Sequence, residues 1–320
     1  MGDFWSNTRL VTSRLPQQSK PTGGGVVQWQ LPKVGFLAAI GLRISATLTG
    51  TLSNLNPLGV SSVVRNVALT TNSSIDILRV SGAGYAYLLD EMMHHRWSRA
   101  TPQNQGRSAV ATGTYNLDMW LPVALNLSST HGLLLLQNEQ LTATLSVDFL
   151  PDTQVATGAT VTATVKPTLF YYLVPRSPED FPPLNILHTI TEETQAVSGA
   201  GDVTYVLPRG YTYLQVLHGL GIGSTGSDNF SRFQVRVGQS QFPYDWDVDT
   251  MDVLFRTLTG RARPAGGIFL DYIGLSGDGD YGMPRDLLNS AVVTDLAHII
   301  TATSAGTLYT IRRQLVPLAV

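Results

Sequence analysis

Three aspartates in one short segment come closest to a metal-binding pattern in this chain. Asp245, Asp247 and Asp249 alternate along the sequence, as carboxylates do at the start of a calcium-binding loop. Such a loop also needs glycine at its sixth position and glutamate at its twelfth, where this chain has Thr250 and Arg256. We favour a helix N-terminus capped by Asp249, where acidic side chains meet the helix dipole. The sequence therefore predicts no metal site, and these three aspartates are its best metal candidates. The Gly277–Gly282 loop also carries two aspartates that could hold a cation, but its glycines favour tight turns.

The other reactive side chains do not form a catalytic set. His94 and His95 are adjacent, so on a helix their rings point about 100° apart and cannot share a metal ion well. Glu192 and Glu193 lie in a strand-like run and face opposite sides of it. The glycine-rich Gly221–Gly226 loop lacks the lysine of a phosphate-binding loop, and the chain has no cysteine nucleophile. We expect no catalytic residue, no cofactor and no enzyme activity.

The composition narrows the classes of partner. The chain has 320 residues, 43% of them hydrophobic and only 14% charged, with a net charge of −2. A charged fraction below the usual ~25% indicates that much of the surface is covered by partners. The sequence has no basic run, which argues against direct sequence-specific binding of nucleic acid. The longest apolar run, Val34–Leu42, is too short to span a membrane.

Alternating apolar and polar residues predict many short strands. Leu42, Ile44, Ala46 and Leu48 alternate with polar residues, and several later segments repeat this pattern. Turn-forming clusters separate these runs, and one amphipathic helix is expected in each half, at residues 81–94 and from Asp249 onwards. The pattern predicts an all-β chain of two tandem eight-stranded jelly rolls, each with a short helix.

The two halves follow the same plan. Leu-Val-Pro ends both Thr164–Pro175 and Gly306–Pro317, and these endings lie 142 residues apart. The segments that start at Thr142 and Asp118 match segments that start 150 residues later. A period this long indicates two copies of a whole β-domain.

The predicted domain boundaries follow from the proline and glycine clusters. Residues 1–28 are polar, contain two prolines and end near three glycines, so we expect an N-terminal arm. A first jelly roll would span residues 29–175, a proline-rich linker 176–183, and a second jelly roll 184–320. The candidate arm residues for contacts with neighbours or a membrane are Phe4, Trp5, Arg9, Leu10 and Arg14.

The order of these segments resembles the double jelly-roll major capsid proteins of tailless, icosahedral, membrane-containing bacterial and archaeal viruses. A strand ending near Ser81-Gly82 leads into a helix at Tyr85–Met92, and Val235–Gly238 leads on to a helix at Asp249–Leu258. The segments Pro284–Leu296 and Tyr309–Pro317 look like the final strands of that family.

The resemblance implies a structural protein of the virion, assembled in the host cytoplasm. Three copies would form a homotrimer with a pseudo-hexameric outline, and such capsomers would tile an icosahedral shell around a lipid vesicle. The implied partners are neighbouring capsomers, minor capsid or penton proteins and, through the N-terminal arm, lipids of the inner membrane.

Two other functions stay open from the sequence. A carbohydrate-binding or glycan-processing protein with two jelly rolls would need an aromatic groove, for which Trp120, Tyr244 and Trp246 are the candidates. A minor virion spike or vertex protein is the other alternative.

Overall fold

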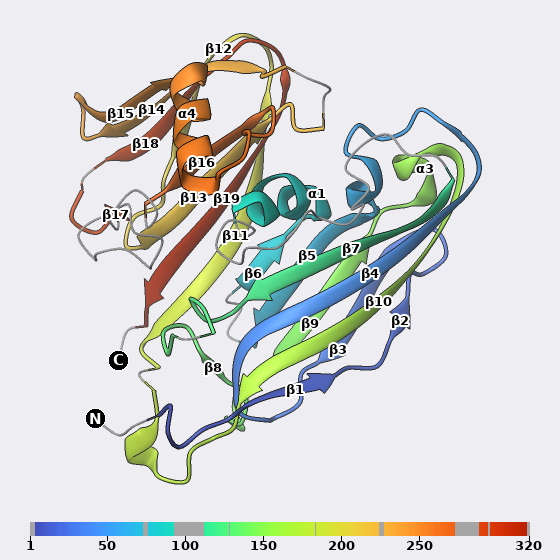
Figure 1. Ribbon diagram of the computed structural model, residues 1–320, viewed down its shortest axis with the longest axis vertical. Coiled ribbons are helices and arrows are strands. Elements are labelled where there is room, and N and C mark those ends of the chain that lie inside the picture. Colours follow the sequence, from blue (N-terminus) through green and yellow to red (C-terminus); the bar gives the residue numbers. More distant parts are fainter. Residues whose placement is uncertain are drawn as a thin grey trace. The chain divides into compact units, whose positions relative to one another are not determined.

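The chain forms two compact units in the computed structural model (Figure 1). Unit 1 comprises Met1–Ala83, Pro102–Thr191 and Leu315–Val320, and unit 2 comprises Gly84–Thr101 and Glu192–Gln314. The structure describes residues 4–72, 76–92, 112–127, 129–182, 184–223, 227–272, 288–293 and 295–318.

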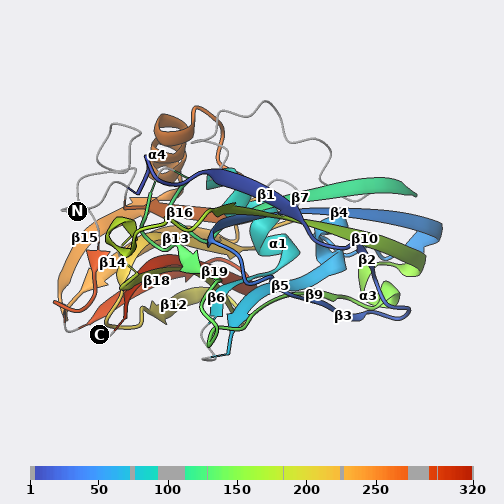
Figure 2. The same ribbon diagram turned by 90° about the horizontal axis from the view of Figure 1, so that it is seen from below.

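Unit 1 is built from two four-stranded sheets that face each other, which Figure 2 shows as two layers. The first sheet has the order β1 (Leu10–Arg14), β10 (Thr157–Tyr172), β4 (Phe36–Ser53), β7 (Gly113–Pro122), with the short strands β2 (Gln18–Ser19) on β10 and β8 (Leu134–Leu135) on β4. The second sheet has the order β3 (Gly25–Gln30), β9 (Ala143–Phe149), β5 (Val64–Thr71), β6 (Asp76–Val80).

The predicted alternation places the core of unit 1 between these sheets. Leu42, Ile44, Ala46 and Leu48 are all at most 2% exposed, whereas Arg43 between them is exposed. Strand β9 alternates buried and half-buried residues along its whole length. The strand predictions for these two segments are confirmed, because a half-buried strand sends every second side chain into the core.

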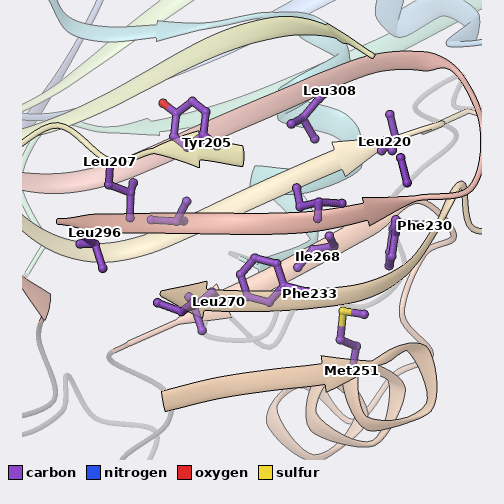
Figure 3. Packing of buried hydrophobic residues seen from close by; sticks show 14 of the residues in the cluster. Tyr205, Leu207, Leu220, Phe230, Phe233, Met251, Ile268, Leu270, Leu296 and Leu308 are labelled. Atoms are coloured by element: carbon purple, nitrogen blue, oxygen red, sulfur yellow. The ribbon is translucent and has the colours of Figure 1, made fainter. Parts of the chain in front are cut away.

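Unit 2 repeats the same construction. Its first sheet has the order β11 (Ile186–Val197), β19 (Gly306–Pro317), β13 (Thr212–Leu220), β16 (Gly267–Asp271), with β17 (Leu288–Asn289) on β13; β11 and β19 contribute residues 192–197 and 306–314 to this unit. The second sheet has the order β12 (Gly201–Val206), β18 (Leu296–Ala302), β14 (Phe230–Val237), β15 (Gln241–Asp247). Figure 3 shows side chains from this unit, including Met251 of helix α4 (Val248–Thr259), packed in its core.

The main strands of the two units follow one topology. Numbered along the chain within each unit, the first sheet is 1-8-3-6 and the second is 2-7-4-5 in both units. This arrangement is the jelly roll, in which two antiparallel sheets with Greek-key connections form one core. The predicted fold of two tandem eight-stranded jelly rolls is therefore confirmed. The three segment pairs that suggested a repeat lie on or next to the sixth, seventh and eighth strands of their units.

Each unit's fifth strand is followed by a helical segment. After β6 come α1 (Gly82–Gly84) and the π-helical turn η2 (Tyr85–Leu89), and the helix continues to Met92. After β15 comes α4 (Val248–Thr259). The first was predicted to be amphipathic, but every residue from 82 to 92 is buried, so its polar face also packs inside the protein. Residues 93 and 94 of that prediction lie outside the described residues.

The N-terminal residues form strands of unit 1. Strand β1 pairs with β10 along all five of its residues, and β3 pairs with β9. The boundary predicted between residues 28 and 29 falls inside β3. Sequence patterns missed this because the partner strands lie more than a hundred residues later, and only such pairing orders a proline-rich segment.

Several shorter elements were also not predicted. These are the helical turns η1 (Gly59–Val63), α3 (Asp152–Val155) and η3 (Pro178–Asp180), the last of which lies in the predicted linker. Strand β15 was missed because its aspartates suggested a loop. Within the described residues, no helix is long and apolar enough to cross a membrane.

Lysine is rare in this chain, and two of its three lysines have specific structural roles. Lys20 forms an ion pair with Asp152, and its side chain is only 2% exposed. The ammonium of Lys33 donates to the backbone carbonyls of Asn138 and Glu139, each at 2.9 Å, and to that of Leu141. An ammonium has three donors on one atom, so it can serve three converging carbonyls that a planar guanidinium cannot.

We predict that Lys33→Met lowers the free energy of unfolding by about 1–2 kcal/mol, because three carbonyls lose a charged donor. Lys166→Met is the matched control, since Lys166 is exposed on β10 and its replacement should change stability by less than about 0.5 kcal/mol. Chemical denaturation of both variants measures the difference. Equal stabilities would show that the Lys33 contacts contribute nothing.

Candidate functional site

The acidic segment lies at the junction of β15 and α4, and its carboxylates have separate roles. Asp245 accepts two hydrogen bonds from Arg232, whose Nε lies 2.7 Å from Asp245 Oδ1. Asp247 caps α4, accepting from the backbone N–H of Thr250 at 2.8 Å. Asp249 is an exposed residue in the first turn of the helix. Among the described residues, no three His, Asp or Glu side chains are grouped so that they could hold a metal ion.

The helix cap differs from the one predicted. Asp249 was expected to cap the helix, but the cap is Asp247, two residues earlier. The hydrogen bonds from Thr250 lower the pKa of the Asp247 carboxyl, because they favour its charged form. The alternating aspartates gave two possible caps, and only the position where β15 ends selects one of them.

A buried arginine, Arg263, lies shortly after the end of α4 and binds two carboxylates. Arg263 donates to Asp252 Oδ1 at 2.7 Å and binds both carboxylate oxygens of Asp228, at 3.0 and 2.7 Å. Burial alone would raise the pKa of Asp228, but hydrogen bonds from Arg263 and from Gly266 N–H keep it below the ordinary value. The sequence did not single out Arg263, because its carboxylate partners lie on separate segments: Asp252 is on helix α4, and Asp228 precedes β14.

The predicted N-terminal contact residues divide into one buried and four exposed. Phe4 is 5% exposed and packs edge-on against Phe36 and Tyr172, with ring centroids 5.7 Å apart in both cases. Trp5 is 43% exposed and Leu10 is 38% exposed. Arg9 and Arg14 are exposed as well.

Trp5 and Leu10 belong to a small apolar patch in unit 1 that also includes Leu173. Leu173 is 46% exposed, and its N–H donates to the carbonyl of Arg9 at 3.0 Å. Leu10 pairs with Tyr172 in the sheet, and the Trp5 ring lies 5.3 Å from the Tyr172 ring. The patch is therefore assembled from both ends of unit 1's sequence, and Arg9 adjoins it.

The aromatic residues considered for a sugar groove belong to different units. Tyr244 and Trp246 pack against the core of unit 2, and Trp246 lies 5.7 Å from the ring of Phe233. Trp120 belongs to unit 1, where its ring contacts that of Phe170 at 4.7 Å. Two of the three candidates are thus packing residues of the second jelly roll.

The remaining candidates from the sequence have other roles or lie outside the described residues. Glu193 on β11 accepts from the Tyr205 hydroxyl at 2.7 Å and forms an ion pair with Arg312. Gly221 and Gly223 have positive φ angles of 75° and 82°, as expected of a turn. His94, His95, residues 224–226 and residues 277–282 lie outside the described residues.

A chain of buried polar side chains crosses the core of unit 2, and sequence reasoning missed it. His218 on β13 and His298 on β18 come from opposite sheets, and His218 Nε2 lies 2.7 Å from His298 Nδ1. His218 Nδ1 lies 2.9 Å from Thr310 Oγ1, and His298 Nε2 lies 3.3 Å from the Tyr272 hydroxyl. An imidazole–imidazole hydrogen bond needs one donor and one acceptor, so at least one of the two rings must be neutral.

Burial keeps both rings neutral. It lowers the pKa of His218 from 6.5 to about 3. The pKa of His298 is also lowered, first by burial and then by the neighbouring His218. Burial likewise raises the pKa of the Tyr272 hydroxyl well above 10. This row of hydrogen-bonded side chains joins the two sheets of one jelly roll. Its members are buried, so their role is structural.

Comparison with known proteins identifies the fold. A scan of protein-family models matched none to this chain, and a search of curated proteins also gave no match. Solved structures do match over nearly the whole chain. A structure described as the STIV MCP is 14% identical, with a TM-score of 0.70 and 97% of each chain covered.

Two further matches have the same extent. The capsid of the virus PBCV-1 is 11% identical, with a TM-score of 0.65 and coverage of 96% of this chain and 94% of that one. The major capsid protein P2 of bacteriophage PM2 is 13% identical, with a TM-score of 0.58 and coverage of 97% and 98%. At these identities the likeness establishes a shared fold across both units, in agreement with the topology.

We predict that acid weakens unit 2 through the His218–His298 pair. Both folded pKa values lie below the unfolded value of about 6.5, so the stabilisation is present above pH 6.5 and decreases as the pH falls below it. For His218 this loss continues down to its folded pKa of about 3. Each histidine contributes a slope of about 1.4 kcal/mol per pH unit below 6.5. Hydrogen exchange of β13 and β18 between pH 7 and pH 5 measures this loss.

The variant His298→Gln should halve the pH slope, because one buried imidazole remains. His131→Gln is the control, since His131 is exposed in unit 1. An unchanged slope in His298→Gln would show that the pair does not control the acid response.

Proposed function

We propose that this chain is a major capsid protein. Three copies form a homotrimer with a pseudo-hexameric outline, and these capsomers tile an icosahedral shell around a lipid vesicle. The observation that carries the proposal is the repeat of one eight-stranded topology in both units. A trimer of a two-unit chain presents six similar units, so it can occupy a sixfold position in a hexagonal lattice.

Two further observations support this function. Three solved structures that match more than nine-tenths of both chains are described as the STIV MCP, the PBCV-1 virus capsid and the major capsid protein P2 of bacteriophage PM2. Only 14% of the residues are charged, which suits a chain that buries broad faces against copies of itself, since obligate interfaces are depleted of charge. The role is structural and involves no catalysis.

The proposal also defines location and partners. The chain lies in the capsid of a virion and assembles in the host cytoplasm. Its partners are two further copies in the trimer, neighbouring capsomers and the minor or penton proteins that complete a shell. It makes no sequence-specific contact with nucleic acid.

We predict that light scattering on the purified chain gives the mass of three chains, about 104 kDa from the chain mass of 34.6 kDa. Negative-stain images should then show a hexagonal outline, because each copy contributes two similar units. A stable monomer at all concentrations would contradict the proposal and would make glycan binding the next function to test. Copy number in purified particles separates a shell protein from a spike or vertex protein.

We further propose that the exposed N-terminal residues Trp5, Arg9, Leu10 and Arg14 contact the inner membrane or neighbouring subunits. Tryptophan and leucine insert at a lipid interface, and arginine pairs with anionic headgroups. Phe4 serves instead as the anchor that holds this segment in its own unit.

We predict that replacing both Trp5 and Leu10 with serine reduces flotation of the trimer with anionic lipid vesicles at least threefold, because the apolar contact is lost. The control is Val26→Ser, since Val26 is 49% exposed on β3 of the same unit. Point substitutions are needed because deleting residues 2–25 would also remove β1 from the sheet. Normal flotation with impaired shell assembly would assign the patch to neighbouring subunits.

A further inference from the structure

In unit 2, a helical segment covers the outer face of the first sheet. Residues 84–92, which follow β6 in the chain, belong to this unit. A methyl group added to Gly219 of β13 would lie 3.1 Å from Leu88 Cδ1, so the helix packs closely on the strand. Glu91 at the end of the helix forms an ion pair with Arg261 at 3.3 Å. Strands β13 and β16 are consequently buried on both faces.

The equivalent face of unit 1 has no such cover among its described residues. Strands β4 and β7 hold the same third and sixth places in their sheet as β13 and β16 do in theirs. Their outward side chains stay accessible: Arg43 is 59% exposed and its partner Asp118 is 46% exposed. Asn116 on β7 is exposed as well. Within the part of the chain that the structure describes, the sheet of unit 2 is therefore covered at β13 and β16, whereas that of unit 1 is open around Arg43, Asn116 and Asp118.

Helix α4 has the complementary property. It follows the fifth strand of unit 2, as residues 84–92 follow the fifth strand of unit 1. Residues 84–92 are buried on every side, but α4 buries only the face that carries Met251 and Phe255. Val253 on its other face is 65% exposed, and Asp249 and Arg256 are also exposed.

We propose that α4 of one copy covers the outer face of β4 and β7 in unit 1 of a second copy. The inference rests on the proposed trimer and names one of its contacts. In a closed ring of six similar units, each contact between neighbouring units recurs in similar form. The helix after a fifth strand already lies on β13 and β16 within the chain, and the contact between copies repeats this arrangement.

The charges on the two surfaces are complementary. The N-terminal end of α4 is acidic, with Asp247 and Asp249 both exposed. On the open sheet, Lys166 lies directly opposite Arg43 across β10 and β4. Arg43 is paired with Asp118, so these three side chains together carry one net positive charge. An acidic helix end facing a basic strip fixes the orientation in which two copies dock. This gives the acidic segment a role that needs no metal ion.

The contact is small compared with a complete subunit interface. A helix of 12 residues is about 18 Å long and about 10 Å wide, so it covers about 180 Å². A stable interface takes about 800 Å² from each partner. The helix contact therefore determines how the copies are oriented, and other surfaces supply most of the buried area.

The first test places a charge in the contact. Val253→Arg should weaken the trimer, so that it dissociates at a concentration at least ten times higher than that of the unsubstituted protein. The melting temperature of the monomer should stay unchanged, because Val253 is exposed in the monomer. Val206→Arg is the matched control, since Val206 is 61% exposed on β12 and lies outside the contact. Equal trimer stability in both variants would overturn the inference.

The second test uses the absence of cysteine from the chain. Two differently tagged chains are coexpressed, one with Val253→Cys and one with Asn116→Cys, and oxidised. A disulfide forms only where the two Cβ atoms come within about 4.5 Å. The proposed contact brings residues 253 and 116 of two copies together, so we expect a product that carries both tags. The control pair, Val206→Cys with Asn116→Cys, should give no such product.

The two tests separate this inference from the function on which it rests. A trimer that forms normally, tolerates Val253→Arg and gives no crosslink at 253–116 would overturn the inference alone. A chain that remains monomeric at all concentrations would overturn both.

Discussion

Each jelly roll depends on the pairing of its first strand with its last. In unit 1, β1 pairs with β10 although about 160 residues separate Leu10 from Tyr172. In unit 2, β11 is the neighbour of β19. This pairing completes the first sheet of each unit, whose alternating side chains fill the space between it and the second sheet. Without it, the last strand of each unit would present a largely unpaired edge.

The same constraint explains the apparent N-terminal arm. Residues 1–28 have the composition of a disordered segment, with two prolines and a glycine triplet. Pairing with β10 and the burial of Phe4 nevertheless order the described part of this segment within unit 1. Such pairing is costly in chain entropy and forms only when the whole unit folds. The segment's exposed residues, Trp5 and Leu10, become a patch because the strand beneath them is fixed.

The polar groups of this protein differ in whether the local sequence gives a signal for them. The acidic segment was recognised, and its reading as a helix start is confirmed, although the cap is Asp247 and not Asp249. The His218–His298 pair was not recognised, because the two rings are 80 residues apart and each stands alone in an apolar strand. A pattern of this kind has no local signal, since its meaning lies in a contact between two sheets.

The sequence by itself determined the fold class and the repeat. Alternation over strands such as residues 42–48, and turn clusters between them, depend on neighbours within a few residues, and these local rules are readable from sequence. Only the tertiary structure decided which strands are first and last, which helix is buried on all sides, and which sheet stays open. Those properties arise from contacts across more than a hundred residues, where the geometry of the closed unit selects among locally equal possibilities.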